Sequence, residues 1–299
     1  MDKDMDKGED RNNAEGGVSR RDFTALSVAA GLAASAGSAH AALAVTESDV
    51  AIKTPDGVCD AAYIRPSTGK YPGVLVWTDI FGLRPSFRDL GKRLAGEGYA
   101  VLIPNPFYRT AKSPVVVDAS TFDFNDPANR QKTGSWTAPI NQPGAIERDA
   151  AAHIAFLDAQ KEVNTAKKIG TQGYCMGGPL VFKTAASISN RVGAGATFHG
   201  GGLVTDTPTS PHLLIPQMKS RMYIAIAASD DSKQPDAKDK LKAAFAAAKL
   251  TAEVTVYDGT IHGWTVRDMP KQDGKPIYNQ ADAERAWGNL LALYKTSIA

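Results

Sequence analysis

The stretch IGTQGYCMGGPLVF, from Ile169 to Phe182, decides the fold. It is typical of a short buried strand followed by a glycine-rich turn and a helix. Within it, Gly173, Cys175 and Gly177 form a G-x-nucleophile-x-G turn in which cysteine takes the place usually held by serine. Glycine at the two flanking positions leaves room for a sharp turn where a larger side chain would clash. The stretch therefore predicts a nucleophile at the end of a strand; the alternative is a glycine-rich turn around a buried, inert cysteine.

The helix predicted from Gly177 onward has a second consequence for Cys175. Its free N–H groups and the positive end of its dipole would face the sulfur, which favours the thiolate. The backbone N–H of Met176 would lie at the same helix end, where it could stabilise a developing oxyanion. A thiolate beside an oxyanion donor is an arrangement suited to acyl transfer.

Strand and helix patterns alternate on both sides of this turn. They predict strands at 74–77, 100–103, 168–171, 192–198, 222–227 and 252–257, and helices near 85–97, 144–160, 177–188, 235–250 and 282–296. This alternation predicts an α/β fold with a mostly parallel central sheet and helices on both faces. The Pro55-Asp56-Gly57 turn predicts an antiparallel hairpin before that sheet. The segment 105–143 has no sustained period and is too long for an ordinary connection, so we expect a lid or a binding loop there.

The histidine partner of Cys175 follows by elimination. In folds with this turn, the acid and then the histidine come after the nucleophile, at the ends of later strands. His153 lies in a predicted helix before Cys175, and His199 and His212 precede any acidic residue that ends a later strand. His262 lies in the loop directly after the last predicted strand, so we expect it to be the base; the alternative is a solvated loop histidine.

The acid is expected where the strand 222–227 ends. That strand runs into Asp230 and Asp231, and we favour Asp230 because it comes first after the strand. The competing interpretation of both carboxylates is charge at the start of the next helix.

Composition excludes several classes of protein. The 299 residues are 43% hydrophobic and 22% charged, which suits a domain with a sizeable core. A net charge of +2 gives no electrostatic case for nucleic acid or an anionic membrane as partner. Cys59 and Cys175 allow at most one disulfide. The sequence contains no GxGxxG after a strand, no P-loop, no HExxH and no CxxC, so we expect neither a metal nor an organic cofactor.

The N-terminal residues 1–41 predict an export signal. The segment Ser19-Arg20-Arg21-Asp22-Phe23 precedes a weakly hydrophobic stretch rich in Ala, Gly and Ser, which is the layout of a twin-arginine signal. Ala39-His40-Ala41 and Ala42-Leu43-Ala44 both offer a small-x-small cleavage pattern. A membrane anchor is the alternative, but the stretch has little apolar side chain for a stable membrane span. We expect residues 42–299 to form one domain, exported to the periplasm by the twin-arginine machinery.

Taken together, these motifs resemble the dienelactone hydrolase family, whose members have the α/β-hydrolase fold. The resemblance rests on the Gly173–Gly178 turn, on Asp79-Ile80-Phe81-Gly82, on Pro104-Asn105-Pro106-Phe107-Tyr108, on Ala228-Ser229-Asp230-Asp231 and on His262-Gly263-Trp264. It implies a Cys–His–Asp triad of Cys175, His262 and Asp230. It also implies that the N–H groups of Ile80 and Met176 form the oxyanion hole.

The sequence departs from the family pattern at Asp79. The founding enzyme type of the family has a glutamate there that holds the resting thiol, and Asp79 is one methylene shorter. We expect Asp79 to modulate the thiol; a loop-capping carboxylate is the alternative. Members of the family also bind a substrate carboxylate through arginines. Arg109, Arg130 and Arg267 are the candidates here, but their spacing does not assign any of them to that role, so we expect a neutral ester or lactone as substrate instead of dienelactone itself. Phe81, Tyr108, Trp136 and Trp264 could line an aromatic pocket.

These residues predict a hydrolase that cleaves a small ester or lactone, as a carboxymethylenebutenolidase does, through a cysteine acyl-enzyme. A thiolate leaves more easily than an amine, which argues against a peptidase. Two other functions stay open: an exported protein of this fold that binds a small molecule or a partner without turnover, and redox activity through Cys59 and Cys175. Redox activity needs the two sulfurs within disulfide-bonding distance, which nothing in the sequence indicates.

Overall fold

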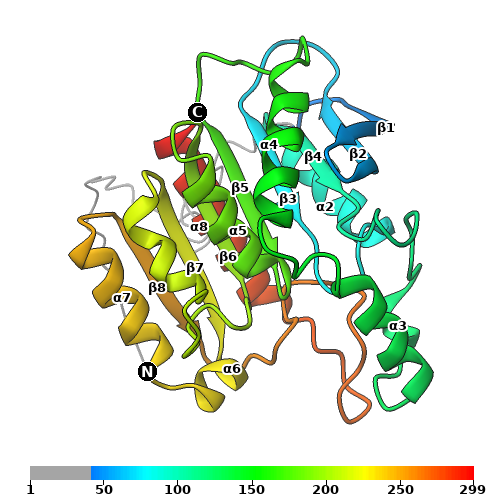
Figure 1. Ribbon diagram of the computed structural model, residues 1–299, viewed down its shortest axis with the longest axis vertical. Coiled ribbons are helices and arrows are strands. Elements are labelled where there is room, and N and C mark those ends of the chain that lie inside the picture. The colour runs from blue at the N-terminus through cyan, green and yellow to red at the C-terminus, as the bar shows by residue number, and fades with distance from the viewer. Residues whose placement is uncertain (1–41) are drawn as a thin grey trace, which may run out of the picture. The chain divides into compact units, whose positions relative to one another are not determined.

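Within residues 42–299, eight strands form a single sheet in the order β1-β2-β4-β3-β5-β6-β7-β8 (Figure 1). The computed structural model describes residues 42–299, and Leu43–Ala299 form one compact unit. The strands are β1 (Val45–Thr54), β2 (Gly57–Pro66), β3 (Gly73–Trp77), β4 (Ala100–Pro104), β5 (Ile169–Tyr174), β6 (Val192–Phe198), β7 (Arg221–Ala227) and β8 (Ala252–Tyr257). The predicted export signal lies outside the described residues.

The sheet is antiparallel only at its N-terminal edge. β1 pairs with β2 through the Pro55-Asp56-Gly57 turn, and β2 pairs antiparallel with β4. Every other pair of neighbours, from β4 to β8, is parallel. All five residues of β3 and all five of β4 are buried, as expected of strands covered on both faces.

Helices cover both faces of the sheet. They are α2 (Pro85–Gly96), α3 (Pro127–Thr137), α4 (Ala145–Asp158), α5 (Gly177–Ser187), α6 (Ala228–Lys233), α7 (Ala237–Ala247) and α8 (Gln280–Ser297). Leu75 and Trp77 belong to one buried cluster with side chains of α4, α5 and α7, whereas Val74 and Val76 belong to a second cluster with side chains of α2 and α8. Alternate residues of a strand face opposite sides, so β3 contributes to two cores. The predicted α/β-hydrolase fold is confirmed.

The segment 105–143 is more ordered than its sequence pattern indicates. It contains a short 3-10 helix (η1, Ala119–Thr121) and the three-turn helix α3. The Asp126 carboxylate caps α3 by accepting a hydrogen bond from Ala128 N–H, and Pro127 occupies its first turn. Only Thr133 of α3 is buried, so this helix carries no apolar stripe for a periodicity analysis to detect.

Within residues 42–299, no helix is both long and apolar enough to cross a bilayer.

Candidate active site

Cys175 occupies the sharp turn between β5 and α5. Its φ is 50°, a left-handed conformation that is uncommon for a residue other than glycine. The backbone N–H of Cys175 donates to the Phe198 carbonyl at 3.1 Å, and its carbonyl accepts from Gly178 N–H at 3.0 Å. The sulfur-bearing residue is half-buried. A strained turn fixed at both backbone groups holds the side chain at the carboxyl edge of the sheet.

The two glycines of the turn are required by close backbone contacts. A Cβ atom on Gly173 would lie 2.2 Å from the Gly177 carbonyl oxygen. A Cβ atom on Gly177 would lie 2.5 Å from the carbonyl oxygen of Trp77, at the end of β3. The start of α5 therefore packs directly against the loop that leaves β3 and carries Asp79 and Ile80.

His262 lies in the loop after β8 and is bonded to α6. Its Nδ1 atom lies 2.7 Å from Oδ2 of Asp230. Its backbone N–H donates to Ser229 Oγ at 2.9 Å, and Ser229 N–H donates to the Thr260 carbonyl at 3.2 Å. Asp231 instead accepts two hydrogen bonds from Lys238 Nζ, at 2.8 and 2.9 Å. Of the two candidate acids, Asp230 is the one that contacts the imidazole.

The pKa of His262 reflects both of its neighbours. Burial acts to lower this pKa, but the hydrogen bond from the ring to Asp230, the neighbouring Cys175 side chain and the charges of both groups raise it to about 10. Because Nδ1 is engaged by Asp230, Nε2 is the ring nitrogen left for the thiol. This arrangement stabilises the imidazolium form of the His262 ring.

His199 is a neighbour of His262 that the sequence pattern did not reveal. It is fully buried, its φ is 41°, and its ring meets the His262 ring edge-on with centroids 5.1 Å apart. Its Nε2 lies 2.8 Å from Thr265 Oγ1. Burial and the nearby His262 charge hold the pKa of His199 well below its usual value. A neutral His199 leaves His262 as the ring that carries charge.

Asp79 is bound by an arginine of its own loop. Its Oδ1 accepts from Phe81 N–H at 2.9 Å and from Arg84 Nη1 at 2.7 Å, and its Oδ2 accepts from Arg84 Nη2 at 2.9 Å. Burial raises the pKa of the Asp79 carboxyl, while the Arg84 charge opposes that shift. Among the described residues, none of the hydrogen bonds of Asp79 goes to Cys175. The bond to Phe81 is the loop-capping arrangement, and the sequence analysis missed Arg84 as its partner.

The two expected oxyanion donors are not used by the fold. Within residues 42–299, the backbone N–H groups of Ile80 and Met176 donate no hydrogen bond. Met176 precedes the first turn of α5, where backbone N–H groups have no partner within the helix. Neither N–H group therefore has an acceptor within the described residues.

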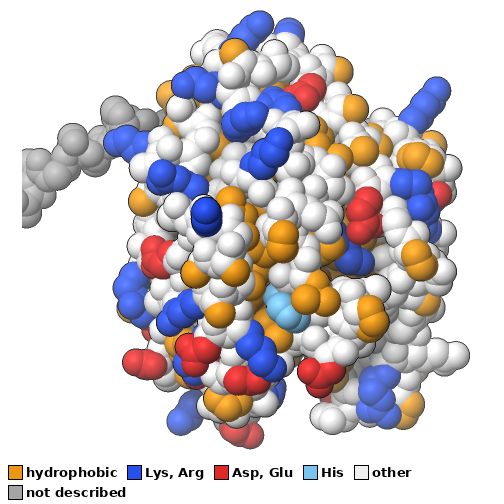
Figure 2. All heavy atoms as spheres, turned by 60° about the vertical axis from the view of Figure 1, so that its left-hand side comes forward, with side chains coloured by type: hydrophobic (Ala, Val, Ile, Leu, Met, Phe, Trp, Pro, Cys, Tyr) orange, Lys and Arg blue, Asp and Glu red, His pale blue; other side chains and the backbone are white. Residues whose placement is uncertain are grey.

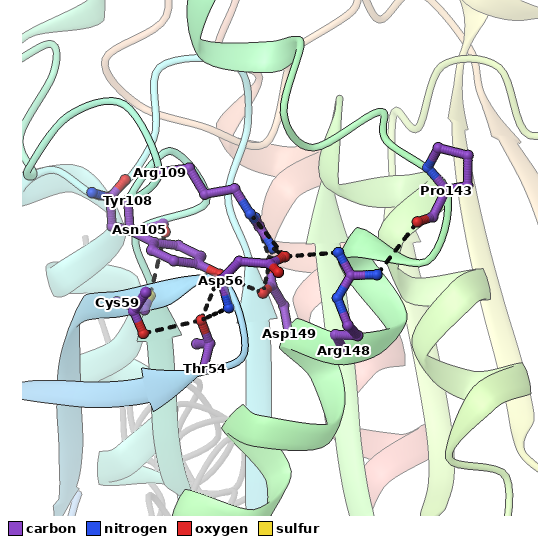
Figure 3. A network of polar contacts seen from close by, with 10 residues as sticks. Thr54, Asp56, Cys59, Asn105, Tyr108, Arg109, Pro143, Arg148 and Asp149 are labelled. Atoms are coloured by element: carbon purple, nitrogen blue, oxygen red, sulfur yellow. Dashed lines mark hydrogen bonds and ion pairs between the residues drawn. The ribbon is translucent and has the colours of Figure 1, made fainter.

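Tyr108 and Arg109 belong to a polar network that joins the β1–β2 turn to α4 (Figure 3). The Tyr108 hydroxyl lies 2.7 Å from Thr54 Oγ1 and 2.8 Å from Asp149 Oδ1. Arg109 donates to both oxygens of Asp149 and to Asp56, which also accepts from Arg148 at 2.8 Å. These contacts anchor the start of the segment 105–143 to the body of the domain.

The other residues considered for substrate binding have different surroundings. Trp264 is fully buried, with its ring 4.5 Å from that of Tyr257, and Trp136 packs against the core near Phe107. Phe81 is buried against Phe122 and Phe124, with ring centroids 5.2 and 5.5 Å away. Arg130 donates to the carbonyls of Phe124 and Asn125, and Arg267 lies over the Tyr278 ring.

A separate cavity of about 490 Å³ lies on the α2 and α8 side of the sheet. Its walls include Phe87, Trp287, Thr265, Tyr174 and Phe198, the last two being the residues directly before Cys175 and His199.

Among residues 42–299, no group of three or more His, Cys, Asp or Glu side chains is placed to hold a metal ion. Figure 2 shows a face where hydrophobic side chains gather around a partly exposed histidine and charges of both signs are interspersed.

The sequence profile of the dienelactone hydrolase family matches residues 59–298. The chain belongs to the dienelactone hydrolase family. A "Putative carboxymethylenebutenolidase" of Methylorubrum extorquens is 28% identical over 285 residues, which cover 91% of each chain. The carboxymethylenebutenolidase of Rhodococcus opacus is 27% identical over 215 residues, covering 71% of this chain and 78% of the relative. The family membership and these relatives make the protein an ester or lactone hydrolase.

Solved structures agree with this family assignment at the level of the fold. The structure named "Putative Dienelactone Hydrolase" from Klebsiella pneumoniae matches with a TM-score of 0.68 at 24% identity, covering 84% of this chain and 99% of that one. A dienelactone hydrolase-like promiscuous phosphotriesterase from metagenomic libraries matches with the same TM-score of 0.68 at 22% identity, covering 86% and 100%.

Proposed function

We propose that the protein hydrolyses small, uncharged carboxylic esters or lactones through an acyl-enzyme on Cys175. The observation that carries the proposal is the contact of His262 Nδ1 with Asp230 at 2.7 Å, which leaves Nε2 of the ring for Cys175 on its sharp turn. The unused N–H groups of Ile80 and Met176 support it, since acyl transfer needs donors for the oxyanion.

In the first half of the reaction, the Cys175 thiolate attacks the carbonyl carbon and a carbon–sulfur bond forms. The electron pair of the carbonyl moves to its oxygen, which the Ile80 and Met176 N–H groups bind. When the tetrahedral intermediate collapses, the alkoxide leaves and takes a proton from the His262 imidazolium.

In the second half, His262 takes a proton from water, and the resulting hydroxide adds to the thioester carbonyl. The carbon–sulfur bond then breaks, the acid is released and the thiolate is regenerated with the imidazolium beside it. Asp230 fixes the ring orientation and the tautomer throughout, because Nδ1 is bonded to its carboxylate.

The preference for uncharged substrates follows from the surroundings of the arginines. Arg84 and Arg109 are paired with buried carboxylates, and Arg130 donates to backbone carbonyls. At Arg84, Arg109 or Arg130, a substrate carboxylate would have to displace one of these partners, which a neutral ester need not do.

The test is hydrolysis of p-nitrophenyl butyrate by the full chain and by Cys175→Ala, with Cys59→Ser as the control. Cys59 is fully buried and burial raises its pKa far above that of a free thiol, so Cys59→Ser should keep activity. Cys175→Ala should lose hydrolysis; activity equal to that of the unmodified protein would refute the acyl-enzyme.

A second substrate tests the preference for uncharged esters. Mono-p-nitrophenyl succinate, of similar length but with a carboxylate, should react more slowly, and a preference for it would refute the uncharged substrate class.

We further propose that Arg20 and Arg21 direct export to the periplasm by the twin-arginine machinery, with cleavage after Ala41. Support for this cleavage site comes from Leu43, whose N–H donates to the Gly96 carbonyl at 2.9 Å, and from Ala44, whose carbonyl accepts from Ser67 N–H at 2.8 Å. Cleavage after Ala44 would remove both bonds, and cleavage after Ala41 removes neither. The double variant Arg20→Lys/Arg21→Lys should leave uncleaved protein in the cytoplasm. Export and cleavage of that variant would contradict the proposal.

A further inference from the structure

Arg84 uses every N–H of its guanidinium inside the protein. Two N–H groups, on Nε and Nη2, donate to Asp268 at 2.7 and 2.8 Å. Two more, on Nη1 and Nη2, donate to Asp79 at 2.7 and 2.9 Å. The fifth N–H group, also on Nη1, donates to the Gly82 carbonyl at 3.2 Å. A guanidinium has five N–H donors, so none is left for a substrate or for water.

The plane of this guanidinium is also fixed by packing. The side chain is 0% exposed, and the rings of Phe81 and Phe87 lie 5.3 and 5.0 Å from its central carbon. Burial acts to lower the pKa of Arg84, but the charges and hydrogen bonds of Asp79 and Asp268 raise it, so the group stays charged. A charge of this kind is costly to bury unless its partners are held in place.

The two carboxylates belong to the two loops that carry the proposed chemistry. Asp79 directly precedes Ile80, and its Oδ1 also accepts from Phe81 N–H at 2.9 Å, so its position sets the backbone on both sides of Ile80. Asp268 follows His262 by six residues in the loop after β8. Arg84 therefore connects the loop of the oxyanion donor to the loop of the base.

We propose that Arg84 is a positioning residue for acyl transfer, which anchors on Asp268 and, through Asp79, aims the Ile80 N–H at the oxyanion. This inference rests on the proposed function. It predicts that loss of Arg84 weakens oxyanion stabilisation and leaves the reactivity of the Cys175 thiolate unchanged. Alkylation of Cys175 by iodoacetamide is displacement at a saturated carbon and forms no oxyanion, so it depends on the thiolate but not on Ile80 N–H.

The experiment compares Arg84→Lys with Arg88→Lys in the full chain. Arg88 is one turn further along α2, is partly exposed, and pairs with Glu47 and Asp49 on β1. Lysine keeps the charge at either position but cannot bond two carboxylates with a planar fork. For each folded variant, kcat for p-nitrophenyl butyrate and the rate of Cys175 alkylation are measured.

We expect Arg84→Lys to lower kcat by on the order of 10²-fold, the cost of losing one oxyanion donor, with alkylation and KM near their original values. Arg88→Lys should change neither rate. If Arg84→Lys leaves kcat unchanged, or lowers kcat and alkylation in equal proportion, Arg84 is a structural residue only and the inference is wrong.

A second variant decides the matter if Arg84→Lys does not fold. Asp268 is 19% exposed, and Asp268→Asn leaves the buried Arg84–Asp79 pair with balanced charge. We expect kcat to fall by about 10-fold in this variant, a partial loss of the oxyanion contribution, with alkylation retained. An unchanged kcat would overturn the inference. Failure of the proposed function is distinct, because the unmodified protein would then show no hydrolysis that depends on Cys175.

Discussion

Asp230 contacts the imidazole of His262, with Oδ2 2.7 Å from Nδ1, while Asp231 accepts a hydrogen bond from Lys238. The two aspartates lie in the first turn of α6, where successive side chains point about 100° apart. Only one of them can therefore face the loop after β8.

Asp230→Asn should damage catalysis far more than Asp231→Asn. In serine proteases the corresponding change costs about 10⁴-fold in kcat. A thiol ionises more readily than a hydroxyl, so we expect a smaller loss here, on the order of 10²-fold, for Asp230→Asn. Asp231→Asn removes only a partly exposed ion pair and should cost less than about 1 kcal/mol of stability with little loss of kcat. The reverse order in steady-state hydrolysis would assign the acid to Asp231.

The free energy of unfolding should fall as pH rises from about 6.5 to about 10. The pKa of His262 is raised to about 10 in the folded protein, above the value of about 6.5 for a free histidine. The folded state then binds more protons in this window, so the stabilisation is complete below about pH 6.5 and is lost as pH approaches 10. Denaturant unfolding at several pH values measures this slope.

Two variants identify His262 as the source of that slope. His262→Gln should remove its contribution, and Cys175→Ala should reduce it, because the thiol is one of the groups that raise the pKa of His262. Parallel stability curves for the unmodified protein and His262→Gln would exclude this titration.

Tyr108→Phe should lower stability by about 1 to 2 kcal/mol and leave kcat and KM unchanged, because its hydroxyl bonds Thr54 and Asp149 in the polar network. Tyr63→Phe is the matched control, since the buried Tyr63 hydroxyl has no partner within residues 42–299 and its removal should not destabilise. Thermal unfolding and steady-state kinetics measure both effects. A raised KM with unchanged stability in Tyr108→Phe would instead make Tyr108 a substrate contact.

Gly173→Ala should destabilise the protein by about 3 kcal/mol or more, since the new Cβ would lie 2.2 Å from a backbone oxygen. Gly201→Ala is the control, because a Cβ at that position meets no atom within 4 Å. Chemical denaturation compares the two variants. Equal stabilities would mean that the turn before Cys175 can relax to admit a side chain.

Local patterns in the sequence determined the architecture and the position of the turn. Alternating apolar runs predicted the strands of the parallel sheet, and the spacing of Gly173, Cys175 and Gly177 predicted a turn that only glycine permits at its ends. Both signals come from residues within a few positions of one another, where periodicity and backbone sterics act. Helix α3 was not predicted, because it buries almost no side chain and its sequence therefore has no periodic apolar stripe.

Contacts between distant loops were decided only by the tertiary structure. The choice between Asp230 and Asp231 depends on where α6 begins, and the contact of His199 with His262 depends on the order of strands in the sheet. Arg84 meets Asp268 across 184 residues of sequence. No local pattern encodes such a pair, because its geometry exists only once β3, α2 and the loop after β8 have packed together and excluded water from the charges.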